Sequence, residues 1–159
     1  MTTGTEAPPS AYRALPLGHD ARFASNEVCM SATTEQALRM LHDLRAATPD
    51  IEAAAVVSPD GFIIASLLPA DVDEGQMAAL SAAMLAMGVK TSADLRKGTL
   101  HQVLIQSEDG CIVVMNAAGE AALSVMSRKS PQLGLLFMEM RRTAALIGNL
   151  LSQPPEPSS

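Results

Sequence analysis

The chain has 159 residues, 48% of them hydrophobic, which is enough for one domain with a buried core. A formal net charge of −6, with no Trp, one Tyr and three Phe, argues against a nucleic-acid or anionic-membrane binder. Both kinds of binding depend on basic patches, and the binding of single-stranded nucleic acid also depends on aromatic stacking. The two cysteines, Cys29 and Cys111, have no metal-ligand spacing and are interpreted as reduced thiols. Without a signal-peptide pattern at its start, the chain is expected to be cytoplasmic.

Three segments are predicted from composition. Residues 1–31 are rich in Thr, Ala, Ser and Pro without sustained periodicity, and are predicted to be a disordered arm. Residues 32–152 form the domain, and residues 153–159 (QPPEPSS) form a disordered tail because proline excludes helix and sheet.

The first helix is predicted over residues 34–47. Thr33 and Gln36 fit a capping box at its start, and leucines recur inside it at helical spacing. A hairpin follows, with strands at residues 52–57 and 62–67. The segment Ser58-Pro59-Asp60-Gly61 between them suits a tight turn.

The central helix is predicted from Glu74 to about Leu95. Asp71 and Asp73 precede it as candidate capping residues. Its stretch QMAALSAAMLAMGV, residues 76–89, has no charge and is apolar nearly all round, so it must be covered on more than one side. It is too short to cross a bilayer, which takes about 20 apolar residues. We interpret it as an association surface; the alternative is a helix enclosed within one domain.

Three more strands are predicted over residues 99–107, 111–117 and 121–126, with Glu108-Asp109-Gly110 as a hairpin turn. The strand 111–117 is apolar on both faces and is expected in the centre of the sheet or next to it. The strand 99–107 carries His101 and Gln102 on its two faces, which suits an edge that invites pairing with a second copy. Ser130-Pro131 is expected to open the last helix.

The predicted fold is therefore of the α/β (α+β) class. Its element order is α-β-β-α-β-β-β-α, and the short connections make the neighbouring strands antiparallel. Five strands with helices on both faces give a three-layer sandwich.

A search for catalytic motifs finds none. Gly88-Val89-Lys90-Thr91-Ser92 lacks the glycine that a phosphate-binding loop requires directly before its lysine. His19, His42 and His101 are far apart and match no metal or base spacing. The chain is expected to be no enzyme and to need no cofactor or metal. Arg96 and Lys97, a basic pair at the end of the central helix, are the candidate contact for a nucleotide-hydrolysing partner, or simply complement the helix dipole.

Residues 34–151 resemble a Roadblock / dynein-light-chain domain of the bacterial type. The resemblance lies in SPQLGLLFMEMRRTAALIGNLL (130–151), SPDGF (58–62), EDG (108–110) and VVMNAAGEAALSVM (113–126). It implies the Roadblock (profilin-like) fold and a homodimer with paired central helices and third strands. It also implies a small Ras-like GTPase as partner, bound on the face made by both central helices, with the protein as regulator, scaffold or activator.

The residues predicted at the dimer or partner interface lie on the central helix and the third strand. They are Met77, Leu80, Ser81, Met84, Met87, Gly88, Thr91, Leu100, Gln102, Val103, Leu104 and Ile105. Two other functions stay open at this point: a ligand-binding module with an internal pocket, and a purely structural adaptor.

Overall fold

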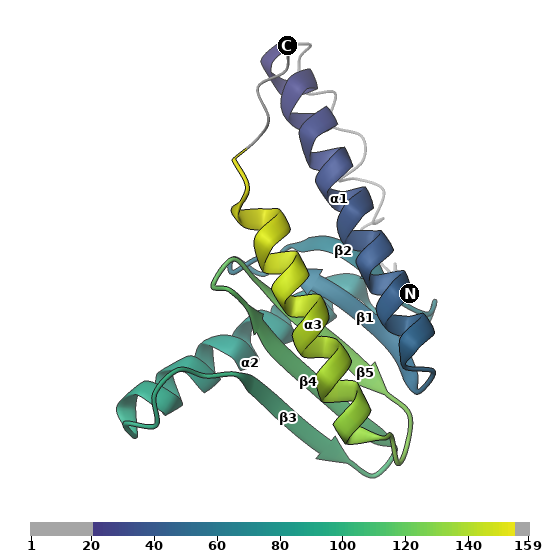
Figure 1. The fold of residues 1–159 in the computed structure, drawn as a ribbon, viewed down its shortest axis with the longest axis vertical. Helices are drawn as coiled ribbons and strands as arrows, with labels where there is room; N and C mark the ends of the chain where they lie inside the picture. Colours follow the sequence, from purple (N-terminus) through teal and green to yellow (C-terminus); the bar gives the residue numbers. More distant parts are fainter. Residues whose placement is uncertain (1–20, 155–159) are drawn as a thin grey trace, which may run out of the picture.

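The computed structural model describes the backbone of residues 21–154 and the side chains of residues 32–154 (Figure 1). A five-stranded sheet lies between helices on both faces. The elements are α1 (Ala21–Ala47), β1 (Ile51–Val57), β2 (Ile63–Leu67), α2 (Glu74–Asp94), β3 (Gln102–Ser107), β4 (Gly110–Ala117), β5 (Ala121–Ser127) and α3 (Leu133–Ser152). The predicted element order and three-layer architecture are confirmed.

The strands are arranged in the order β2-β1-β5-β4-β3, and every neighbouring pair is antiparallel. β4 lies next to the central strand β5, and β3 lies at an edge, as the sequence predicts. The β1–β2 turn is closed by hydrogen bonds from Ser58 N to Phe62 O at 2.8 Å and from Gly61 N to Ser58 O at 2.9 Å. A short turn of this kind fixes the register of the hairpin.

The sheet separates two apolar cores. On one face α1 and α3 pack against each other and against the strands, and on the other face α2 crosses all five strands (Figure 1). Alternate residues of β1 point to opposite faces: Ala54 and Val56 join the core under α1 and α3, and Ala55 and Val57 join the core under α2. Because only one helix covers the second face, parts of that face stay open beside it.

Two helix starts differ from prediction. α1 begins at Ala21, so it extends into the segment predicted as a disordered arm and runs through the expected cap at Thr33. α3 begins at Leu133 with Gln132 as its N-cap. Ser130 is not the cap: it has a φ of 58°, and Asp50 Oδ2 instead accepts a hydrogen bond from Gln132 N at 3.2 Å. The remaining arm, residues 1–20, and the end of the tail, residues 155–159, lie outside the described residues.

Candidate interaction surface along α2 and β3

α2 begins at a well-formed cap. Asp73 Oδ1 accepts a hydrogen bond from Gln76 N at 2.7 Å, and Glu74 lies in the first turn, where the positive end of the helix dipole favours an acid. Of the two candidate caps, Asp73 is therefore the one that caps the helix. Ser66 Oγ of β2 donates to Glu74 Oε1 at 2.6 Å, which ties the helix start to the sheet edge.

α2 ends in a Schellman motif, in which Lys97 N donates to Ser92 O at 2.8 Å and Arg96 N donates to Ala93 O at 3.1 Å. The residue in the left-handed position is Arg96, with a φ of 56°. Glycine is usual there, because the left-handed conformation costs other residues about 1–2 kcal/mol. Both Arg96 and Lys97 are exposed, so the helix presents two cations at its end.

Only a narrow side of α2 faces its own sheet. Met77, Ala78 and Ser81 are buried, and the Ser81 hydroxyl is satisfied by Met77 O at 2.6 Å. Further round the helix, Leu80 is 55% exposed and Met87 is 67% exposed. Met77 therefore lies against the sheet, whereas Leu80 and Met87 lie at the margin of the same helix face and are left uncovered.

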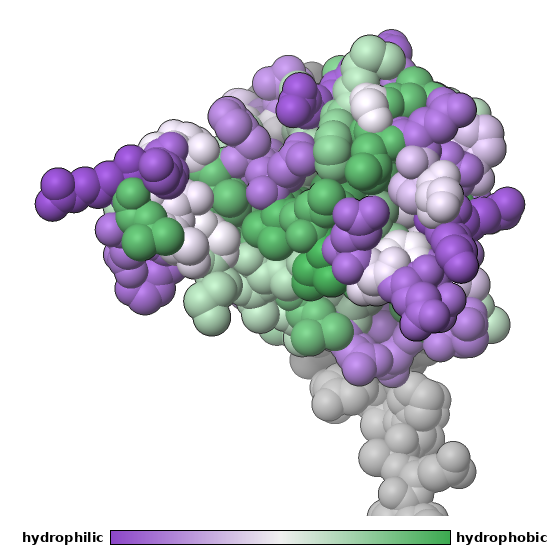
Figure 2. All heavy atoms as spheres, turned by 90° about the horizontal axis from the view of Figure 1, so that it is seen from below, coloured by the Kyte–Doolittle hydropathy of each residue, from purple (hydrophilic) through white to green (hydrophobic). Residues whose placement is uncertain are grey.

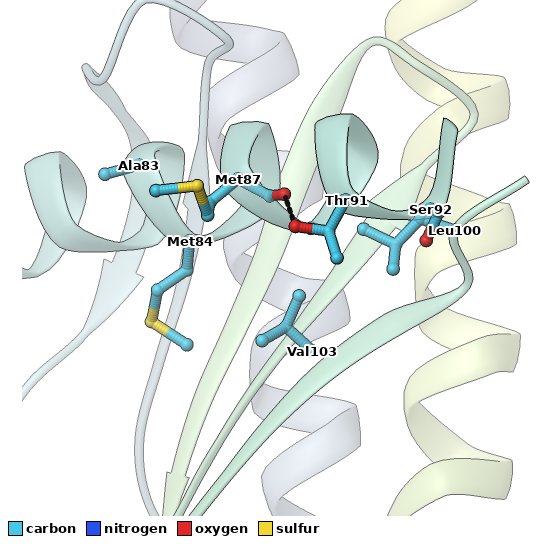
Figure 3. A pocket seen from close by; sticks show the side chains of 8 residues that line it. Ala83, Met84, Met87, Thr91, Ser92, Leu100 and Val103 are labelled. Atoms are coloured by element: carbon cyan, nitrogen blue, oxygen red, sulfur yellow. Dashed lines mark hydrogen bonds between the residues drawn. The ribbon is translucent and has the colours of Figure 1, made fainter. Parts of the chain in front are cut away.

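Gly88 sets the distance between α2 and β3. A Cβ at this position would lie 2.6 Å from Val103 Cγ2 and 2.8 Å from Leu100 Cδ2, so a side chain there would push the helix away. Beside this contact lies a groove of about 510 Å³ lined by Ala83, Met84, Met87, Gly88, Thr91, Ser92, Leu100 and Val103. In Figure 3, Met84 and Thr91 extend from α2 toward the strand that carries Val103. Thr91 Oγ1 donates to Met87 O at 2.7 Å, so the hydroxyl is already paired with the helix.

β3 continues the apolar surface beyond the helix. β4 pairs with one edge of β3, and no strand among residues 21–154 pairs with the other edge. Ile105 is exposed on the same face of the sheet as Val103 and α2, and the next residue, Leu104, is exposed on the opposite face. Seen from this end of the molecule, apolar side chains form a continuous band bordered by hydrophilic ones (Figure 2). Contiguous exposed apolar patches bordered by polar residues are typical of surfaces at which proteins associate.

The predicted interface residues divide between the α2 side of the sheet and the edge strand β3, where Gln102 and Leu104 face away from α2. Leu80, Met87, Thr91, Leu104 and Ile105 are exposed, and the half-buried ones are Met84, Gly88, Leu100, Gln102 and Val103. Met77 and Ser81 are buried against the sheet, so a partner cannot reach them.

The sequence reasoning missed several residues. Ala83 and Ser92 line the groove, and their spacing of four residues from Met87 and Gly88 was the available signal. On the other flank of α2, a second groove of about 500 Å³ runs past Leu85, Ala86 and Val89 to the β1–β2 turn and the β4–β5 turn. Phe62, 71% exposed, lies in the β1–β2 turn. Small apolar residues occur all round α2, so the sequence pattern does not distinguish this flank from the others.

No group of three or more potential metal ligands occurs within the part of the chain that the structure describes. In the same part, no helix is both long and apolar enough to span a membrane. The described side chains form one ion pair, Lys90 with Asp94 at 2.7 Å, on the exposed side of α2.

Comparison with known proteins decides the family. The family model described as Roadblock/LC7 domain matches residues 37–127, from α1 through β5. The chain belongs to the Roadblock/LC7 domain family. The match ends at Ser127, so α3, the segment with the most specific resemblance by sequence, lies outside it.

Proteins similar to this Roadblock/LC7 domain include sequence relatives and solved structures. The uncharacterized protein MJ1340 of Methanocaldococcus jannaschii is 36% identical over 100 residues, which cover 63% of this chain and 87% of that protein. Among solved structures, a Roadblock/LC7 domain from Streptomyces avermitilis has a TM-score of 0.68 at 19% identity, covering 73% of this chain and 98% of the other. A structure of MglB with tetrameric arrangement has a TM-score of 0.69 at 20% identity, covering 76% and 90%. At these identities the solved structures show the shared fold.

Proposed function

We propose that this Roadblock/LC7 domain is a non-enzymatic, homodimeric regulator or scaffold in the cytoplasm that binds a small Ras-like GTPase and modulates its GTP hydrolysis or localisation. The observation that carries the proposal is the apolar surface on α2 and β3, which the protein's own sheet leaves open. Family membership supports the proposal, because the resemblance to bacterial Roadblock domains implies both the homodimer and the GTPase partner.

The homodimer follows from two features that lie side by side. β3 offers an unpaired edge, and a second β3 related by a two-fold axis would continue the sheet. The exposed side chains of α2, Leu80 and Met87 among them, would then lie against the second α2. A two-fold arrangement covers each exposed patch with the same patch of the other copy, so one surface explains both features. The solved structure of MglB with tetrameric arrangement shows that one relative of the same fold assembles from several copies.

The GTPase would bind the outer face that the two α2 helices form together. Phe62 and the groove beside Val89 lie on the flank of α2 away from β3 and stay accessible in this arrangement. Exposed aromatic residues beside apolar grooves are frequent anchors of protein interfaces. Arg96 and Lys97 line neither groove. An inserted arginine is therefore a poor explanation of any effect on hydrolysis, and reshaping of the GTPase is the better one.

Two measurements test the proposal. Light scattering during gel filtration at tens of micromolar should give a dimer mass, and a monomer at that concentration would contradict the proposal. GTP turnover by a small Ras-like GTPase of the same organism should change when the protein is added. Binding without a change in turnover would favour the adaptor. A monomer stabilised by a small metabolite in a thermal-shift screen would favour the ligand-binding module.

A further inference from the structure

The two ends of β3 carry opposite charges. The connection from α2 into β3 begins with Arg96 and Lys97, and the turn that leaves β3 contains Glu108 and Asp109. All four side chains are exposed. The connection from α2 enters β3 at one end, and the turn to β4 leaves it at the other (Figure 1). The ion pair between Lys90 and Asp94 involves none of them, and it is the one ion pair among the side chains that the structure describes.

The backbone of β3 limits how a second copy can pair with it. His101 O accepts a hydrogen bond from Asn116 N of β4 at 3.4 Å, so the backbone groups of His101 point into the sheet. Because these directions alternate along a strand, Gln102, Leu104 and Gln106 direct their backbone groups outward. A two-fold axis at Leu104, which lies between the other two, would pair Gln102 of one copy with Gln106 of the other.

We infer that each copy in the homodimer forms a charge clamp, in which its Glu108–Asp109 turn lies beside Arg96 and Lys97 of the second copy. The inference rests on the proposed function, since it requires the β3 edges to pair. With the axis at Leu104, antiparallel pairing of Gln102–Ser107 brings the acidic turn of one copy to the end of β3 at which the connection from Arg96 and Lys97 of the other copy arrives. Opposite charges brought near one another in this way attract over the screening distance of about 8 Å at physiological salt.

The clamp gives the dimer a fixed register. Apolar contacts along α2 are non-directional, so they define the register of β3 less sharply than contacts between charges do. A shift of β3 by two residues would separate the acidic turn from the basic pair at both ends. Opposite charges placed at the margins of an interface act in this way, because they favour one register and one partner more than they raise affinity.

Two basic residues of the same chain could compete with the second copy for the acidic turn. Gly110 lies against the backbone of Ser127 and Arg128, so Arg128 and Lys129 are close to the acidic turn. They nevertheless form no ion pair with Glu108 or Asp109 in the structure. The acidic turn therefore stays available to a second copy.

The experiment uses two charge-reversed variants of the full chain. One carries Glu108→Lys and Asp109→Lys, and the other carries Arg96→Glu and Lys97→Glu. Each homodimer would meet like charges at both ends, and its dissociation constant should rise about tenfold or more, given four altered charge contacts per dimer. In a mixture, both ends of the heterodimer pair opposite charges again. Native mass spectrometry of differently tagged variants should then show mainly heterodimer, with an affinity near that of the wild type.

Matched controls separate the clamp from a general effect of charge. Glu35→Lys with Asp43→Lys changes the net charge by the same amount on α1, and Arg141→Glu with Arg142→Glu does so on α3; all four residues are exposed and away from β3. Neither control should weaken the dimer or select heterodimers.

The outcomes are distinguishable. A wild-type chain that stays monomeric overturns the proposed function and the clamp together. A wild-type dimer whose charge-reversed variants associate at random overturns the clamp alone. The same holds if reversal of the basic pair abolishes GTPase binding and leaves the dimer unchanged, since that result would assign Arg96 and Lys97 to the GTPase.

Discussion

Replacing Met87 by Gln tests the surface on α2 directly. Gln has nearly the shape and helix propensity of Met but lacks its apolar character. Because Met87 is 67% exposed in the subunit, the change should leave the folded monomer almost as stable as before. Full burial of a Met side chain is worth about 1.5–3 kcal/mol, so covering the exposed two thirds is worth about 1–2 kcal/mol per copy. Symmetry doubles this to about 2–4 kcal/mol per dimer, which raises the dissociation constant roughly 30- to 1,000-fold.

Met138→Gln is the matched control. Met138 is 58% exposed on α3, a helix on the opposite face of the sheet. Its replacement should leave the dimer unchanged. The dissociation constants of both variants can be measured by sedimentation equilibrium over a dilution series, with thermal unfolding as a check on folding. The reasoning would be refuted if Met87→Gln changed the dissociation constant by less than about threefold, or if both variants weakened the dimer equally.

Three further changes test the structure around the surface. Asp73→Ala should lower the free energy of unfolding by about 1 kcal/mol in urea titrations, because Gln76 N loses its acceptor, and Asp73→Asn should keep most of it. Gly148→Ala should destabilise the domain by about 1–3 kcal/mol, because the new Cβ would lie 2.7 Å from Cβ of Ala118, and Ala118→Gly should restore part of the loss. Ser130→Gly should increase the free energy of unfolding by about 0.5–1 kcal/mol and so raise the melting temperature, because Ser130 has a φ of 58°. Ser130→Ala keeps the strained backbone and should give no gain.

Much of the fold could be predicted because its signals are local. The turn at Ser58–Gly61 and the strands on either side of it follow from residue types at adjacent positions, and β1 indeed alternates between two cores. The start of α1 could not be predicted in the same way. Periodicity marks only the part of a helix that packs on a sheet, and a helix that has formed can extend through residues without a pattern at little cost. The start of α3 at Gln132 was missed because Gln132 makes no side-chain cap hydrogen bond and is held by Asp50, which is distant in sequence.

The sequence by itself determined that α2 has more apolar surface than one sheet can cover, because that property depends only on the residues within the helix. The tertiary structure decided which part is left over. The oblique crossing buries Met77 and Ser81, and the close approach at Gly88 places Met87 and Thr91 beside β3. The angle and height of the helix over the sheet depend on contacts between residues far apart in the chain. No local pattern contains those contacts, so the direction in which α2 presents its free side became visible only in the folded domain.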